Sequence, residues 1–196
     1  MYRVYLAGPD VFFANALEVG ARKQAICAQY GLSGHFPLDN QVPAAGSPWE
    51  TAMAIYRANR DLMLSCDAGL FNVTPYRGVS ADVGTVFELG FFRGLGRPGI
   101  GYSQDRRAFS QRVVGALDGP PQHHDGRLTD SAGLEIENFG CADNLMIDGC
   151  LAELGEALLF SDEGVSGDVT KVDYALFERA VAALAKRLGV TPTAGS

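Results

Sequence analysis

Apolar and polar positions along this chain follow two alternating patterns, one typical of buried strands and the other of helices. Short apolar runs that end at Gly, Pro or Asp predict strands at residues 2–7, 35–36, 68–73 and 98–103. Longer segments with apolar residues three or four apart predict helices at residues 14–30, 49–65, 82–95 and 174–188. This alternation predicts an α/β fold whose parallel sheet is covered on both faces. A ligand site is then expected beyond the carboxyl ends of the strands.

The length of 196 residues suits one α/β domain, which we expect over residues 1–190, followed by a flexible tail at 191–196. A Pro/Gly-rich stretch at 119–126 predicts an exposed excursion from it. Its two histidines are better explained as solvated loop polarity than as metal ligands.

Charge, hydropathy and cysteine content disfavour several classes of protein. The 23 acidic and 16 basic residues give a net charge of −7, which disfavours binding to a phosphate polymer. No apolar run is long enough to span a bilayer, and no secretory signal is visible, so we expect a cytoplasmic protein. The four cysteines are widely spaced, which indicates reduced thiols and neither a zinc site nor a disulfide framework.

The most informative stretch is the nonapeptide DVGTVFELG at residues 82–90. Glu88 lies among apolar and aromatic neighbours, and burying its carboxylate without a partner is costly, so it must face solvent or a pocket. Asp82 is placed to cap the helix, and Gly84 lets a ligand approach the backbone N–H groups. An ordinary helix cap followed by an exposed glutamate is the alternative.

Other candidates accompany the predicted strands. Gly8 and Asp10 follow the first strand and are expected to face the cleft, although Asp10 could simply begin a turn. Asp67 directly precedes the third strand, where a lone aspartate is most often a turn residue. Tyr5 lies among apolar strand residues, so its hydroxyl needs a partner even if the ring only packs in the core. Neither a GxGxxG nor a P-loop motif is present.

Five segments, in order, resemble the nucleoside 2-deoxyribosyltransferases. They are YLAGPDVF (5–12), CDAGL (66–70), PYRG (75–78), DVGTVFELG (82–90) and DNLM (143–146), and the similarity runs from residue 2 to about 147. The resemblance implies a flavodoxin-like, three-layer α/β/α fold with a mainly parallel sheet of roughly five strands. It also implies transfer of a 2-deoxyribosyl group between nucleobases through a glutamate-bound intermediate.

The resemblance also assigns roles to residues of this sequence. Glu88 would be the nucleophile, held by a hydrogen bond from Tyr5, and Asp67 would act as acid and base over the nucleobase. Asp82 would bind the sugar hydroxyls. Asn144 would reach the sugar 5′-hydroxyl in the site of a neighbouring subunit, so a homo-oligomer with shared sites is expected.

The chemistry fits these residue types. Cleavage of an N-glycosidic bond passes through an oxocarbenium-like state that an opposed carboxylate stabilises or traps. The expected partners are deoxynucleosides and nucleobases, and no cofactor or metal is required. Three alternatives stay open: an N-glycoside hydrolase of deoxynucleosides or their 5′-monophosphates, a nucleotide-sensing module without turnover, and an FMN-binding flavodoxin.

Overall fold

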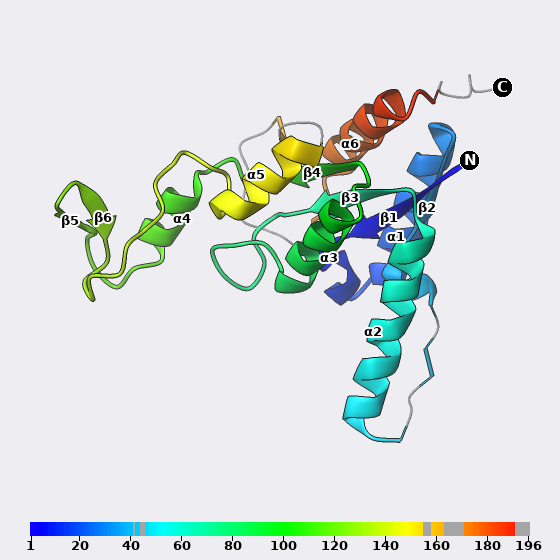
Figure 1. The fold of residues 1–196 in the computed structure, drawn as a ribbon, viewed down its shortest axis with the longest axis horizontal. Coiled ribbons are helices and arrows are strands. Elements are labelled where there is room, and N and C mark those ends of the chain that lie inside the picture. The colour runs from blue at the N-terminus through cyan, green and yellow to red at the C-terminus, as the bar shows by residue number, and fades with distance from the viewer. Residues whose placement is uncertain (41, 44–45, 155–157, 163–170, 191–196) are drawn as a thin grey trace.

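The computed structural model describes residues 1–40, 42–43, 46–154, 158–162 and 171–190. A five-stranded parallel sheet runs through its centre in the order β2-β1-β3-β4-β7 (Figure 1). Its strands are β1 (Tyr2–Ala7), β2 (Leu32–His35), β3 (Ala68–Asn72), β4 (Gly99–Ser103) and β7 (Leu159–Phe160). The predicted α/β class with a parallel sheet of about five strands is confirmed. The strand order is that of the flavodoxin-like arrangement, and the direction of winding reverses between β1 and β3.

Helices cover both faces of the sheet, which gives three layers. The α-helices among the described residues are α1 (Ala16–Gln29), α2 (Pro48–Ser65), α3 (Val83–Gly94), α4 (Phe109–Gly115), α5 (Leu145–Leu154) and α6 (Tyr174–Arg187). On one face, α1 and α6 pack against the sheet through a core that includes Cys27 and Phe177. On the other face, α3 and α5 pack against it around Phe71, Phe92 and Leu151.

The predicted elements agree with the observed ones to within a few residues, because each is encoded locally. Ser47 and Glu50 form a capping box with Pro48 in the first turn of α2, which fixes where that helix begins. Gly31 ends α1 in the left-handed conformation, with a φ of 71°.

Two parts project from the layered body. Figure 1 shows α2, in cyan, extending away from the sheet. Arg3 and Arg97 donate to the backbone carbonyls of Ser65, Met63 and Cys66, which anchors its carboxyl end. Beyond α4 lies the hairpin of β5 (Gln122–His124) and β6 (Arg127–Thr129). The expected excursion at 119–126 is therefore largely a small exposed hairpin. The expected tail at 191–196 lies outside the described residues.

Candidate active site

Tyr5 and Glu88 meet at the centre of the fold. Tyr5 lies in β1 with none of its surface exposed, and its hydroxyl donates a hydrogen bond of 2.5 Å to Oε1 of the half-buried Glu88 in α3. The Tyr5 ring also packs against Phe92 one turn further along α3. The structure thus gives the Tyr5 hydroxyl the partner that burial demands, 83 residues away in the sequence.

The surroundings of Glu88 change its acidity. Burial raises the pKa of its carboxyl from an ordinary 4.5 to about 7, the hydrogen bond from Tyr5 opposes that rise, and the negative charge of Asp82 adds to it. Burial and the neighbouring Glu88 charge hold the pKa of Tyr5 well above its usual range, so the phenol keeps its proton and remains a donor. Glu88 is therefore a carboxyl group that ionises near neutral pH beside a fixed donor, a state typical of functional carboxylates.

Asp82 begins the helix that carries Glu88. Its carboxylate accepts hydrogen bonds from the Thr85 backbone N–H at 3.0 Å and from the Thr85 hydroxyl at 3.2 Å, so the predicted N-cap is confirmed. The cap fixes the start of α3 and keeps a negative charge near Glu88.

An aromatic pair joins the loops that follow β1 and β3. The rings of Phe12 and Tyr76 stack with centroids 5.3 Å apart and planes 9° from parallel. The guanidinium of Arg77 lies 4.9 Å from the Tyr76 ring and 5.4 Å from the Phe12 ring. Arg77 has a φ of 54°, a left-handed backbone conformation that is uncommon for a residue other than glycine. Sequence reasoning gave these residues no role, although each belongs to a segment that carries the family resemblance.

The structure corrects the expectation that Asp10 faces the ligand cleft. Asp10 is 1% exposed, and its carboxylate binds the buried Lys23 ammonium at 2.6 Å and the Asn72 amide at 3.3 Å. A Cβ on Gly8 would lie 2.6 Å from Asp10 Oδ2 and 2.7 Å from Asn72 Cβ. Gly8 therefore permits close packing against this buried group, and Asp10 neutralises a lysine inside the protein.

The structure also corrects the placement of Asp67. Its side chain is exposed at the end of the sheet where β3 begins, and its carboxylate accepts a hydrogen bond of 2.8 Å from the backbone N–H of Arg3. A residue that precedes a parallel strand lies at the edge of the sheet opposite the loops where ligands bind. Asp67 is thus tied to the start of β1 and does not stand over a ligand opposite Glu88.

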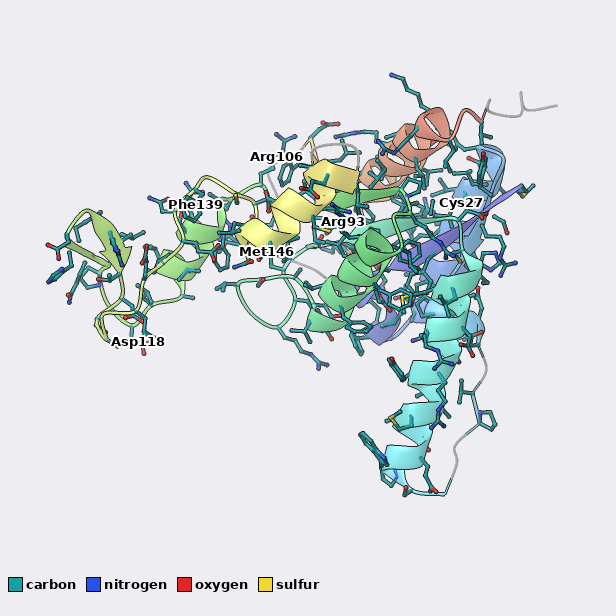
Figure 2. The ribbon with its side chains drawn as sticks, in the orientation of Figure 1. Cys27, Arg93, Arg106, Asp118, Phe139 and Met146 are labelled. Atoms are coloured by element: carbon teal, nitrogen blue, oxygen red, sulfur yellow. The ribbon has the colours of Figure 1, made fainter. Side chains whose placement is uncertain are left out.

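Asn144 lies at the start of α5, where its side chain is held within its own chain. Its amide donates 2.6 Å to Glu137 Oε1, and its Oδ1 accepts from the Met146 backbone N–H at 3.0 Å. The three apolar residues that follow Asn144 are divided. Ile147 is 4% exposed within the core of its own chain, whereas Leu145 and Met146 are 40% and 72% exposed (Figure 2 labels Met146). Ile147 therefore belongs to the core of its own chain, and only Leu145 and Met146 offer apolar surface beside Asn144.

A groove of about 680 Å³ lies between α3 and α5. Its walls are mainly apolar, and Asn144 stands among the lining residues, which also include Val83, Val86, Leu145, Met146 and Cys150. Neither Tyr5 nor Glu88 lines this groove.

The described part of the chain holds neither a candidate metal cluster nor a candidate membrane-spanning helix. Among those residues, no group of three or more His, Cys, Asp or Glu side chains is arranged to hold a metal ion. None of the helices there is both long and apolar enough to cross a bilayer. His123 and His124 are exposed on the small hairpin.

Comparison with known proteins gives consistent matches. The family model described as Nucleoside 2-deoxyribosyltransferase matches residues 4–146. An uncharacterized protein of Schizosaccharomyces pombe is 31% identical over 200 residues, which cover 94% of this chain and 89% of that protein. The solved structure of a 2-deoxyribosyltransferase from Leishmania mexicana is 28% identical with a TM-score of 0.61, covering 93% of this chain and 98% of its own. A conserved protein from Enterococcus faecalis V583, 16% identical with a TM-score of 0.56 over 94% of this chain and 99% of its own, shares the fold.

Proposed function

Because the chain belongs to the nucleoside 2-deoxyribosyltransferase family, we propose that it transfers the 2-deoxyribosyl group of a 2′-deoxynucleoside to a second nucleobase through a covalent intermediate on Glu88. The observation that carries this proposal is the hydrogen bond from Tyr5 to Glu88. This bond fixes the orientation of a carboxyl group that ionises near neutral pH and keeps a proton donor beside it.

In the first half of the reaction, the Glu88 carboxylate attacks the anomeric carbon of the sugar. The bond from that carbon to the base nitrogen breaks, and the base leaves with the electron pair and takes up a proton from solvent. Tyr5 orients the carboxylate by donating to Oε1, which leaves the other carboxylate oxygen to form the new bond. A 2-deoxy sugar lacks an electron-withdrawing 2-hydroxyl, so its cation-like transition state forms more easily.

In the second half, a ring nitrogen of another base attacks the anomeric carbon and gives up its proton to solvent. The bond from that carbon to Glu88 breaks, which releases the carboxylate. Two displacements at one carbon retain the stereochemistry, and the base that leaves first must depart before the second binds. Water in place of the second base would give hydrolysis, which is the second candidate activity and uses the same residues.

Groups at the start of α3 and on the loops that follow β1 and β3 offer contacts to the substrate. Asp82 lies near enough to Glu88 for its negative charge to raise the pKa of that carboxyl, so we assign Asp82 to the sugar hydroxyls. Phe12, with 54% of its surface exposed, and its stacked partner Tyr76 offer an aromatic surface for a nucleobase. Arg77 extends this surface with a cation that lies over both rings.

We also assign the active form to a homo-oligomer, a dimer or larger, in which Asn144 completes the site of a neighbouring subunit. Support comes from the exposed Leu145 and Met146 beside Asn144 and from the apolar groove that they share with α3. An apolar surface beside a polar group of this kind suits an interface between copies of the chain.

A base-exchange assay tests the proposed reaction. The purified protein is incubated with one deoxynucleoside and a different free base, and the products are separated by chromatography. A new deoxynucleoside is expected. Free deoxyribose without a new nucleoside would assign the hydrolase, and an unchanged mixture would indicate a binding protein.

Subunit mixing tests the shared site. Glu88→Ala should be inactive and Asn144→Ala should keep only a small fraction of the wild-type rate. Hybrids formed by subunit exchange should gain activity above both, because some sites then combine an intact Glu88 with an intact Asn144. Confirmed exchange without any recovery would show that each site is built within one chain.

A further inference from the structure

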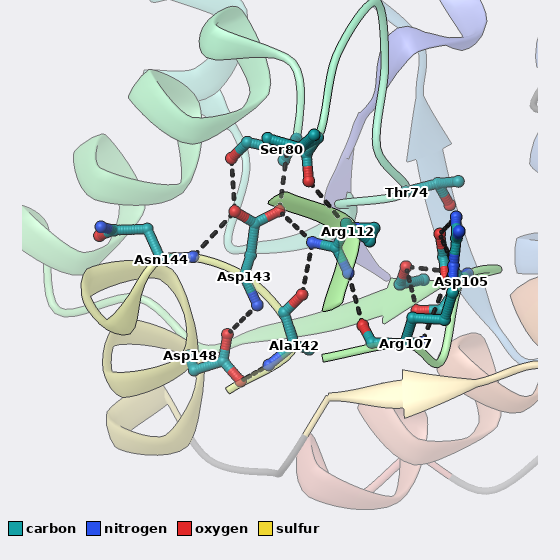
Figure 3. Close-up of polar contacts among 12 residues, drawn as sticks. Thr74, Ser80, Asp105, Arg107, Arg112, Ala142, Asp143, Asn144 and Asp148 are labelled. Atoms are coloured by element: carbon teal, nitrogen blue, oxygen red, sulfur yellow. Dashed lines mark hydrogen bonds and ion pairs between the residues drawn. The ribbon is translucent and has the colours of Figure 1, made fainter. Parts of the chain in front are cut away.

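A buried ion pair contacts the loop that leads into α3. Asp143 and Arg112 approach within 3.2 Å, and their side chains are only 2% and 3% exposed (Figure 3). Arg112 lies in α4, and Asp143 directly precedes Asn144 at the start of α5.

We propose that Asp143 is a positioning residue, which holds Asp82 and Asn144 in register through its buried pair with Arg112. This inference rests on the proposed function, because it explains how one buried group places Asp82 for the site of its own subunit and Asn144 for the site of the neighbouring one. The lone-pair positions of the Asp143 carboxylate connect the two segments.

Each oxygen of the Asp143 carboxylate accepts two hydrogen bonds. Oδ1 accepts from the Ser80 hydroxyl and, at 2.8 Å, from the Asn144 backbone N–H. Oδ2 accepts from the Ala81 backbone N–H at 2.9 Å and from Arg112 Nη2 at 3.2 Å. One carboxylate therefore joins the loop before α3 to the start of α5 (Figure 3).

Arg112 completes the hold on the loop. Its Nε donates 2.7 Å to the Val79 carbonyl, and its Nη2 also donates 2.6 Å to the Ala142 carbonyl. Arg112 and Asp143 together bind Val79, Ser80 and Ala81, the three residues directly before the N-cap Asp82. The position of Asp82 therefore depends on this pair.

The start of α5 is held by Asp143 and by a second carboxylate, Asp148. Asp148 accepts from the backbone N–H groups of Ala142 and Asp143, each at 2.9 Å, so the backbone that carries the Asp143 carboxylate is itself held. Asn144 follows with its N–H on Asp143 and its amide on Glu137. Asp143 thus fixes the backbone of Asn144, while Glu137 sets the direction of its side chain.

An asparagine at position 143 cannot reproduce this pattern. Its side chain has one acceptor oxygen, so its NH₂ group must face either the Ser80 and Asn144 donors or the Ala81 and Arg112 donors. Two donors that face each other do not bond, and Arg112 loses its buried counter-charge. The loop and the helix start are then no longer tied by one group.

The test is a double-mutant cycle on kcat/KM for the deoxynucleoside in the base-exchange assay. A misplacement of about 1 Å can lower a catalytic rate about a hundredfold. Asp143→Asn is therefore expected to lower kcat/KM at least about tenfold, largely through a higher KM. In the Asn144→Ala background, the same change should cost clearly less, because part of the effect of Asp143 passes through Asn144. Asp173→Ala removes the N-cap of α6 and serves as a control that loses stability with kcat/KM retained.

The outcomes separate this inference from the proposed function. A wild-type protein that makes no new deoxynucleoside overturns the proposed function and this inference with it. If the wild type is active but Asp143→Asn retains full kcat/KM, the positioning role alone is overturned. The same holds if Asp143→Asn lowers kcat/KM by the same factor in both backgrounds. If Asp143→Asn does not fold, Ser80→Ala takes its place in the cycle, because it removes one donor to the same carboxylate. A smaller loss of kcat/KM is then expected, and it must again be smaller in the Asn144→Ala background than in the wild type.

Discussion

Replacing Glu88 with glutamine should stabilise the protein in a pH-dependent way while abolishing transfer. The pKa of Glu88 is about 7 in the folded protein, against 4.5 for an ordinary glutamate. Between these two values the unfolded chain has lost its proton and the folded protein still holds it, so the free energy of unfolding falls as pH rises. Above pH ~7 the full shift applies, and it corresponds to a cost of at most about 3 kcal/mol for the ionised side chain.

Glutamine has no charge to bury, and its Oε1 can still accept the hydrogen bond from Tyr5. Glu88→Gln should therefore be more stable than the wild type at pH 8, by as much as about 3 kcal/mol, and nearly equal to it at pH 4.5. Denaturant unfolding at a series of pH values measures the difference. Glu18→Gln makes the same chemical change at an exposed position of α1 and should shift stability by less than about 0.5 kcal/mol.

A Glu88→Gln variant that is no more stable than the wild type at pH 8 would refute this reasoning, because Glu88 would then ionise in the folded protein without cost. A stability difference that stays constant from pH 4.5 to pH 8 would refute it too, because the gain would come from packing and not from the carboxylate charge.

Three further substitutions probe individual contacts. Tyr5→Phe removes a hydrogen bond that lowers the pKa of Glu88, so the acidic limb of the kcat/KM profile should move to higher pH; a move to lower pH would contradict the assigned contact. Asp67→Asn should keep the base-exchange rate within about twofold of the wild type, because this exposed carboxylate is tied to the start of β1. A tenfold loss would restore the acid–base role for Asp67. Lys23→Met should cost about 3–5 kcal/mol of unfolding free energy by leaving the buried Asp10 without its counter-charge, and a loss below about 1 kcal/mol would show that Asp10 is not ionised there.

The sequence predicted the elements whose signals are local. The apolar run of β1, the capping residues of α2 and the Asp82 cap of α3 each act within a few positions, so their periods and end signals were readable without the fold. The short strand β7 carries only two residues and could not be recognised by any period.

The residues that were misplaced depend on contacts between distant segments. Asp10 could be read as a cleft residue because nothing in the sequence shows that Lys23, which looks like a solvated helix residue, is buried against it. The pairing of Asp143 with Arg112 was invisible for the same reason, since the two lie on different elements 31 residues apart. Asp67 had a local signal, its place just before a strand, and that signal indicated the edge of the sheet away from the ligand loops.

The covalent role of Glu88 is tested most directly by mass spectrometry of the protein quenched in acid during turnover of a deoxynucleoside without an acceptor base. A 2-deoxyribosyl adduct is expected on the peptide that contains Glu88. It should disappear when an acceptor base is added before quenching, and it should never form in Glu88→Gln. Base exchange that proceeds with no adduct on that peptide, or that persists in Glu88→Gln at more than about a tenth of the wild-type rate, would contradict the covalent role, because loss of the nucleophile must cost far more than about 1.4 kcal/mol of transition-state stabilisation.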